Sequence, residues 1–213
     1  MNEQRAGAAA LILGTIAMLS VMALHPSGVS GHAGEVAKML RLGVVVHAVA
    51  IGAAPVLTFG FFAFTRSIGF DKPAATLAFF FYLFGALAMM LAATMSGLVA
   101  PRLIELQIAN PADQAAIHNL LRLEWFLNQS FATLHVALFS IAILLWAFAW
   151  PGRGALAAAL QVVGLLVGAG VLAWLFSGTL TLDVPGMGAV ALAQGAWIIL
   201  AAIALAFRKP SVS

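Results

Sequence analysis

Histidine is the residue type in this chain that is best suited to binding a metal ion or a cofactor. The chain has five histidines and no cysteine. Thiolate ligands, disulfides and iron–sulfur clusters are therefore excluded, whereas imidazole can still bind a metal ion or haem iron. All five histidines fall in the same half of the membrane topology that the sequence predicts. This one-sided set indicates a site with a direction, and it comprises His25, His32, His47, His118 and His135.

Two of these histidines lie within predicted membrane spans. His47 follows Arg41 by six residues and His135 follows Ser130 by five, which is about 9 and 8 Å of helix rise. Ionisable residues inside a membrane usually face the bundle interior. We therefore expect His47 and His135 to meet and to bind either haem b or a divalent metal ion, with Glu124 as an oxygen donor to the metal. The structural alternative is that each histidine only hydrogen-bonds across a helix interface.

A polar stripe leads toward His135. Glu124, Asn128 and His135 lie on one helical face, because they are spaced at i, i+4 and i+11. Polar side chains are sparser in the opposite half of the bundle, which favours a pocket open to one face over a continuous channel. The predicted pocket consists of Glu124, Asn128, Gln129, Thr133, Thr94, Ser96 and Gln194.

The other three histidines are weaker candidates. His25 ends the first span beside Pro26, and it is expected to fold over the mouth of the pocket. His32 belongs to a glycine-rich loop and is expected to be solvated. His118 precedes His135 by 17 residues, or about 25 Å along a continuous helix, so these two histidines cannot bind the same ion.

The composition predicts an all-α polytopic membrane protein. Hydrophobic residues make up 63% of the 213 residues and charged residues 8%, against about 25% charged residues in soluble domains. The mean hydropathy of +1.07 agrees, and six apolar stretches are long enough to cross a bilayer. We expect one domain over 1–213, with spans at about 6–24, 36–64, 74–99, 128–149, 155–178 and 188–207.

The distribution of basic residues predicts the orientation. An even number of spans places both termini on one side, together with six lysines and arginines, while four lie on the other side. The positive-inside rule then places both termini in the cytoplasm, most simply across a bacterial inner membrane. These ten basic residues form no run or stripe, so nucleic acid is not an expected partner.

One connection is long, the outer segment 100–127. Within it, Asn110, Pro111 and Asp113 are typical of a helix start, so the fourth helix is expected to run from about residue 111 to 149. The projecting segment is a candidate contact for a second copy of the chain or for a partner in a membrane complex. Shared features of helices two and three with helices four and five also suggest a parallel repeat.

Three functions remain open from the sequence. The first is a redox or binding protein with one haem or metal ion at the outer face. The second is a transporter of a small solute or of protons, and the third is a non-enzymatic accessory or assembly subunit. The sequence has no P-loop, Rossmann glycines, HExxH or GxSxG motif, and it leaves open whether the protein is an enzyme.

Overall fold

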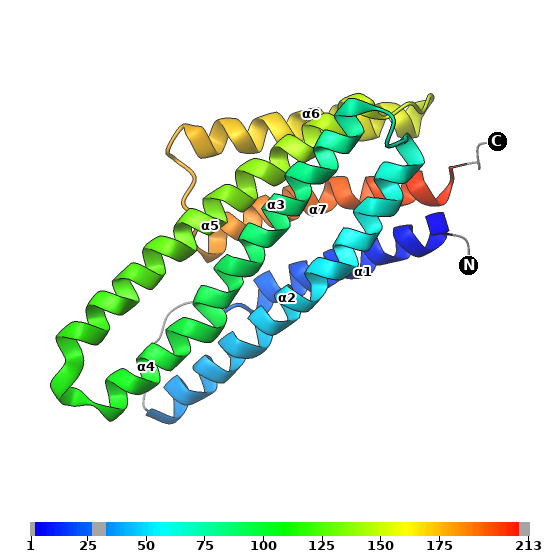
Figure 1. Ribbon diagram of the computed structural model, residues 1–213. Helices are drawn as coiled ribbons and strands as arrows, with labels where there is room; N and C mark the ends of the chain where they lie inside the picture. The colour runs from blue at the N-terminus through cyan, green and yellow to red at the C-terminus, as the bar shows by residue number, and fades with distance from the viewer. Residues whose placement is uncertain (1–2, 27–32, 209–213) are drawn as a thin grey trace.

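The computed structural model describes residues 3–26 and 33–208, and all regular structure over these residues is helical (Figure 1). Residues 1–2, 27–32 and 209–213 are outside the description. The described residues form the α-helices α1 to α7, of which α4 is the shortest, and two short helical turns, η1 and η2. The elements are α1 (Glu3–Leu24), α2 (Ala33–Ile68), α3 (Pro73–Thr94), the π-helical turn η1 (Met95–Val99), α4 (Ala100–Ala109), the 3₁₀ turn η2 (Pro111–Asp113), α5 (Gln114–Ala149), α6 (Ala155–Phe176) and α7 (Val184–Ala206).

Six helical segments are long and apolar enough to cross a membrane, which confirms the predicted number of such segments. One of them is the continuous segment Pro73–Ala109, in which η1 joins α3 to α4. The expected long connection 100–127 is therefore mostly helix, formed by α4 and the first turns of α5. The helix start predicted near residue 111 is found there, because η2 begins at Pro111 and leads into α5.

The helices form an up-and-down bundle whose described first and last residues lie at the same end, here called the termini end (Figure 1). The opposite end, where α1 finishes and α2 begins, is called the histidine end. There the hairpin of α4 and α5 projects beyond α1 and α7 (Figure 1). Within the bundle α3 packs along α5, α1 packs along α2 and α7, and α6 packs on α5.

Small residues allow α1 and α2 to approach closely. A Cβ atom added at Gly7 would overlap the Cβ of Ala63, and one added at Gly60 would press on the side chain of Leu11. Membrane helices have little hydrophobic drive to associate, so close packing at such small residues supplies much of their attraction.

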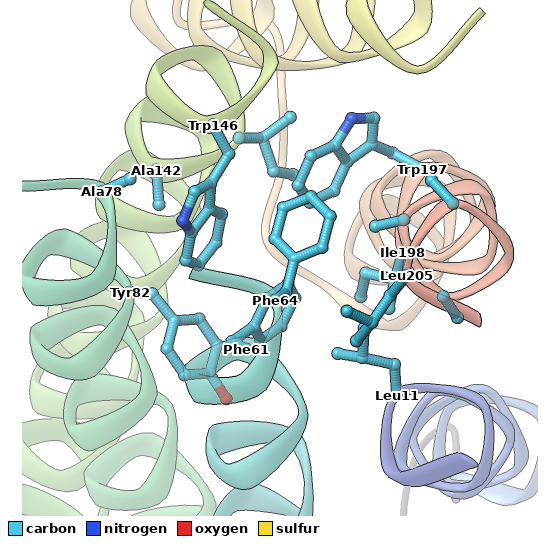
Figure 2. Packing of buried hydrophobic residues seen from close by; sticks show 14 of the residues in the cluster. Leu11, Phe61, Phe64, Ala78, Tyr82, Ala142, Trp146, Trp197, Ile198 and Leu205 are labelled. Carbon is cyan, nitrogen blue, oxygen red and sulfur yellow. The ribbon is translucent and has the colours of Figure 1, made fainter. Parts of the chain in front are cut away.

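Aromatic rings fill the core toward the termini end (Figure 2). Phe61 stacks on Trp146 with ring centroids 4.7 Å apart and planes 7° from parallel. Trp146 in turn stacks on Trp197 at 6.0 Å and 14°. Inside this apolar cluster, Trp146 donates an indole hydrogen bond of 2.9 Å to Oγ1 of Thr65, and both side chains are fully buried. The indole N–H thus has a polar partner in a place where water cannot supply one.

Replacing Thr65 with valine should lower the free energy of unfolding by about 1–3 kcal/mol, because it leaves the buried Trp146 N–H without an acceptor at nearly constant volume. The matched control is Thr133→Val, since the Thr133 hydroxyl is exposed and bonds only the backbone of its own helix at Gln129. Unfolding in detergent, followed by circular dichroism, measures both changes. Equal stability of the two variants would show that the Trp146–Thr65 bond does not stabilise the core.

Candidate functional site

His25 lies immediately beyond the end of α1. The helix ends at Leu24. A proline disfavours the helical conformation of the residue before it, and Pro26 has this effect on His25. The backbone N–H of His25 still reaches the carbonyl oxygen of Met22, at 3.4 Å. The ring is oriented by the chain itself, since Nδ1 lies 3.1 Å from the carbonyl oxygen of Pro26. Nε2 is thereby left to point toward α2.

His47 meets that ring from α2. It is buried, with 8% of its surface exposed, and its Nδ1 lies 2.7 Å from the carbonyl oxygen of Gly43 one turn earlier. Its Nε2 lies 3.3 Å from the Nε2 of His25. The two rings meet edge to face, with centroids 4.9 Å apart and planes at 76°. Two histidines that are 22 positions apart in the sequence therefore form one pair.

The protons of this pair do not balance if both rings are neutral. A carbonyl oxygen can only accept a hydrogen bond, so Nδ1 of each ring must carry its proton toward Pro26 and Gly43. A neutral imidazole has one N–H, so both Nε2 atoms would then present lone pairs to each other. The 3.3 Å contact becomes favourable when a cation lies between them: a proton that turns one ring into imidazolium, or a metal ion.

The π-helical turn η1 brings the continuous α3–α4 helix against His47. The N–H of Ala100 donates to the carbonyl oxygen of Met95, a spacing of five residues rather than four. Such turns within an α-helix are frequently found at functional sites. Gly97 is the contact point, because a Cβ atom there would overlap Cβ and Cγ of His47. Because position 97 has no side chain, the backbone of η1 can pack directly against the imidazole of His47.

Amide side chains on α5 tie the neighbouring walls together. Asn128 donates to the carbonyl oxygen of Ala92 at 2.9 Å and to the hydroxyl oxygen of Ser96 at 2.6 Å. Gln129 donates to Oδ1 of Asn128 at 3.2 Å and to the carbonyl oxygen of Leu182 at 3.3 Å. These bonds join α3, η1 and α5 to the segment that precedes α7, and they engage both amide nitrogens and the Oδ1 of Asn128.

These walls border a partly open cavity of about 330 Å³, here called the His25–His47 cavity. A second hollow of about 150 Å³ adjoins the same two histidines on the side of Pro26 and Pro101. Three of the predicted pocket residues, Asn128, Gln129 and Ser96, line the larger cavity. Its full lining is Met18, Val21, Met22, His25, His47, Ala50, Met89, Ala92, Ala93, Ser96, Trp125, Asn128, Gln129, Ala132, Leu182, Asp183, Val184 and Met187.

His135 belongs to a different place in the bundle. Its Nδ1 lies 3.0 Å from the carbonyl oxygen of Gly85, and its ring stacks on Phe139. It lines a separate cavity of about 60 Å³, together with the predicted pocket residue Gln194. Gly85 and Gly97, the contacts of His135 and His47 on the α3–η1 helix, are twelve positions apart, which is about 18 Å of helix rise. The contacts thus join His47 to His25, and the predicted pairing with His135 stays a prediction.

The remaining predicted residues lie outside the His25–His47 cavity. Glu124 is buried on α5. Thr94 and Thr133 donate their hydroxyls to Met90 and Gln129, the backbone carbonyls four residues earlier on their own helices. His118 is exposed near the start of α5, and His32 falls outside the described residues. Over residues 3–26 and 33–208, no three side chains of His, Cys, Asp or Glu are grouped to hold a metal ion.

The close fit of Gly97 against His47 predicts the effect of adding one methyl group. Gly97→Ala should cost about 1–3 kcal/mol of stability, because the new Cβ and the imidazole cannot occupy the same space. Gly52→Ala on α2 is the matched control, since no atom lies within 4 Å of its added Cβ. That substitution should be neutral or stabilising, because alanine is the better helix former. Similar unfolding midpoints for both variants would contradict the packing of η1 on His47.

Comparison of the chain with protein-family models, with curated proteins and with solved structures finds no match. Any statement about its function must therefore rest on the chemistry of the site. That site is a pair of imidazoles at the histidine end of the bundle, beside a cavity walled by apolar, amide and thioether side chains.

Proposed function

We propose that this protein is an integral membrane protein that binds one metal ion between His25 and His47. The observation that carries the proposal is the pair of Nε2 atoms at 3.3 Å, each in a ring whose Nδ1 already faces a carbonyl oxygen. A histidine that ligates a metal usually donates its other ring N–H to such an oxygen, which fixes the tautomer and the ring orientation. Both rings of the pair have this arrangement.

The distance also suits a tetrahedral ion. Two imidazole ligands with bonds of about 2.0–2.1 Å lie about 3.3–3.4 Å apart around a tetrahedral metal. Bis-histidine haem is less well supported, because two axial ligands on opposite sides of the iron stand about 4 Å apart, twice such a bond length. The ring centroids, 4.9 Å apart, are also too close for two rings that point at an iron from opposite sides.

The proposal includes an orientation in the membrane. The termini end carries Arg5, Arg66, Lys72 and Arg153, and the positive-inside rule supports placing this end in the cytoplasm of a bacterial inner membrane. The His25–His47 cavity would then open toward the outer face. A parallel repeat of helix pairs is supported by the matching lengths of α2 and α5, which have 36 residues each.

A second candidate is a proton carrier at the same pair. The same excess of lone pairs is satisfied by one proton shared between His25 and His47, and intramembrane histidines serve in proton relays. The pair would then be part of a transporter for protons or for a small solute. Metal binding and a shared proton make opposite predictions for a metal titration.

The test is metal content per chain after equilibration of the purified protein with Zn²⁺ and removal of free metal. The wild-type protein should retain one equivalent, and His25→Ala and His47→Ala should each weaken binding at least tenfold, because one imidazole cannot chelate. His118→Ala is the control on the exposed part of α5. Binding should be lost on acidification, since each ligand must keep its lone pair.

Each other outcome has its own meaning. Loss of binding in His135→Ala but not in His25→Ala would overturn the assignment and restore His47 with His135 as the ligand pair. No retained metal in the wild-type protein, for Zn²⁺ and for Cu⁺ supplied under reducing conditions, would overturn the metal proposal and leave the shared proton as the better account.

A further inference from the structure

Methionine is the most unusual component of the His25–His47 cavity. Four of the eight methionines of the chain line it: Met18 and Met22 from α1, Met89 from α3 and Met187 from α7. Met18, Met22 and His25 are spaced at i, i+4 and i+7, so they follow one face of α1 toward the pair. Three helices therefore bring thioether sulfur atoms to the wall that also carries both imidazoles.

Several of the other polar groups of this wall are already engaged. The amides of Asn128 and Gln129 and the hydroxyl of Ser96 take part in the hydrogen bonds that join α5 to η1 and to Leu182. Asp183 is the charged residue of the lining, and its Oδ1 accepts a hydrogen bond of 2.9 Å from the N–H of Gly186 to cap α7. The described residues also provide no third His, Cys, Asp or Glu in a group with the pair. Further protein ligands must then be neutral, and thioether sulfur is the most abundant neutral donor of the lining.

We infer that the metal ion held by His25 and His47 is univalent copper, Cu⁺, with one or more of these methionines completing its coordination. Thioether sulfur is a soft ligand that selects Cu⁺, whereas Zn²⁺ sites are completed by thiolate, imidazole or carboxylate. Charge points the same way. The Born free energy of burying an ion rises with the square of its charge. Burial of a divalent ion among neutral ligands is therefore roughly four times as unfavourable as burial of a univalent one.

This inference rests on the proposed metal site and adds the identity of the ion. In it, His25 and His47 supply two nitrogen ligands, and binding changes no oxidation state, because Cu⁺ is taken up as such. Met22 lies one turn before His25, and Met89 faces the same cavity from α3, so these two methionines are the strongest candidates for the sulfur ligands.

Met89 and Met90 provide a matched pair of variants. Both are neighbours on α3, but Met89 lines the cavity, whereas Met90 is partly buried against the cluster of Val21, Val46 and Ala54. Replacement by leucine preserves size and apolarity at either position while removing the sulfur. A loss seen with Met89→Leu and absent with Met90→Leu therefore reports sulfur at the cavity rather than general damage to the fold.

The experiment measures the affinity of the detergent-solubilised full chain for Cu⁺, by competition with bicinchoninate under anaerobic reducing conditions, beside a Zn²⁺ titration. The wild-type protein should bind Cu⁺ at least a hundredfold more tightly than Zn²⁺. Met22→Leu combined with Met89→Leu should weaken Cu⁺ binding at least tenfold and change Zn²⁺ binding less than twofold. Met90→Leu should match the wild type for both ions, and the unfolding midpoints should confirm that each variant is folded.

Three failures are distinguishable. Binding of Zn²⁺ as tight as that of Cu⁺, with affinities unchanged by the methionine substitutions, would overturn the copper inference and leave the His25–His47 metal site in place. Absence of binding for both ions would overturn the site itself. A Cu⁺ affinity that depends on Met22 and Met89 but not on His25 or His47 would also overturn the inference, because the imidazoles would then not be ligands.

Discussion

Lipid cannot satisfy a polar group, and this constraint shapes both the bundle and its site. Each polar side chain placed among the spans needs a partner within the protein, or it costs several kcal/mol. Trp146 meets this need with Thr65, and Asn128 meets it with Ala92 and Ser96. At the histidine pair the same rule leaves a deficit, because three hydrogen-bonding contacts require three N–H groups and two neutral rings supply two. A bound cation resolves that deficit.

Several elements of the bundle contact the two imidazole rings. Pro26 ends α1 and fixes His25, the carbonyl of Gly43 fixes His47, and Gly97 in the π-helical turn closes the space behind it. Backbone groups thus contact the pair at three points, one on His25 and two on His47. Rigid support of this kind is what a metal site requires to select one geometry.

The sequence predicts the number of apolar spans well, and it carries less information on which side chains meet. Length and hydropathy are sufficient to predict six spans, because a bilayer accepts few alternatives. His47 and His135 were expected at similar depth, counted from the last charge on each helix, yet they contact the α3–η1 helix about 18 Å apart. Depth could not be predicted because the hairpin of α4 and α5 projects beyond α1 and α7 (Figure 1), and the partner of His47 depends on helix rotation. The spacing of Met18, Met22 and His25 places them on one face of α1, which is a sequence signal for the cavity wall. A stripe of this kind within an apolar span resembles ordinary packing, so the signal is weak.

The most direct measurement is the ¹⁵N spectrum of histidine-labelled protein, with resonances assigned by single substitutions and recorded before and after one equivalent of metal. The account predicts that His25 and His47 both carry a proton on Nδ1 and that both Nε2 resonances move together when the ion binds, while His135 does not respond. A proton that stays on Nε2 of either ring in the presence of the metal would contradict the shared site, because that nitrogen would then have no lone pair for the ion.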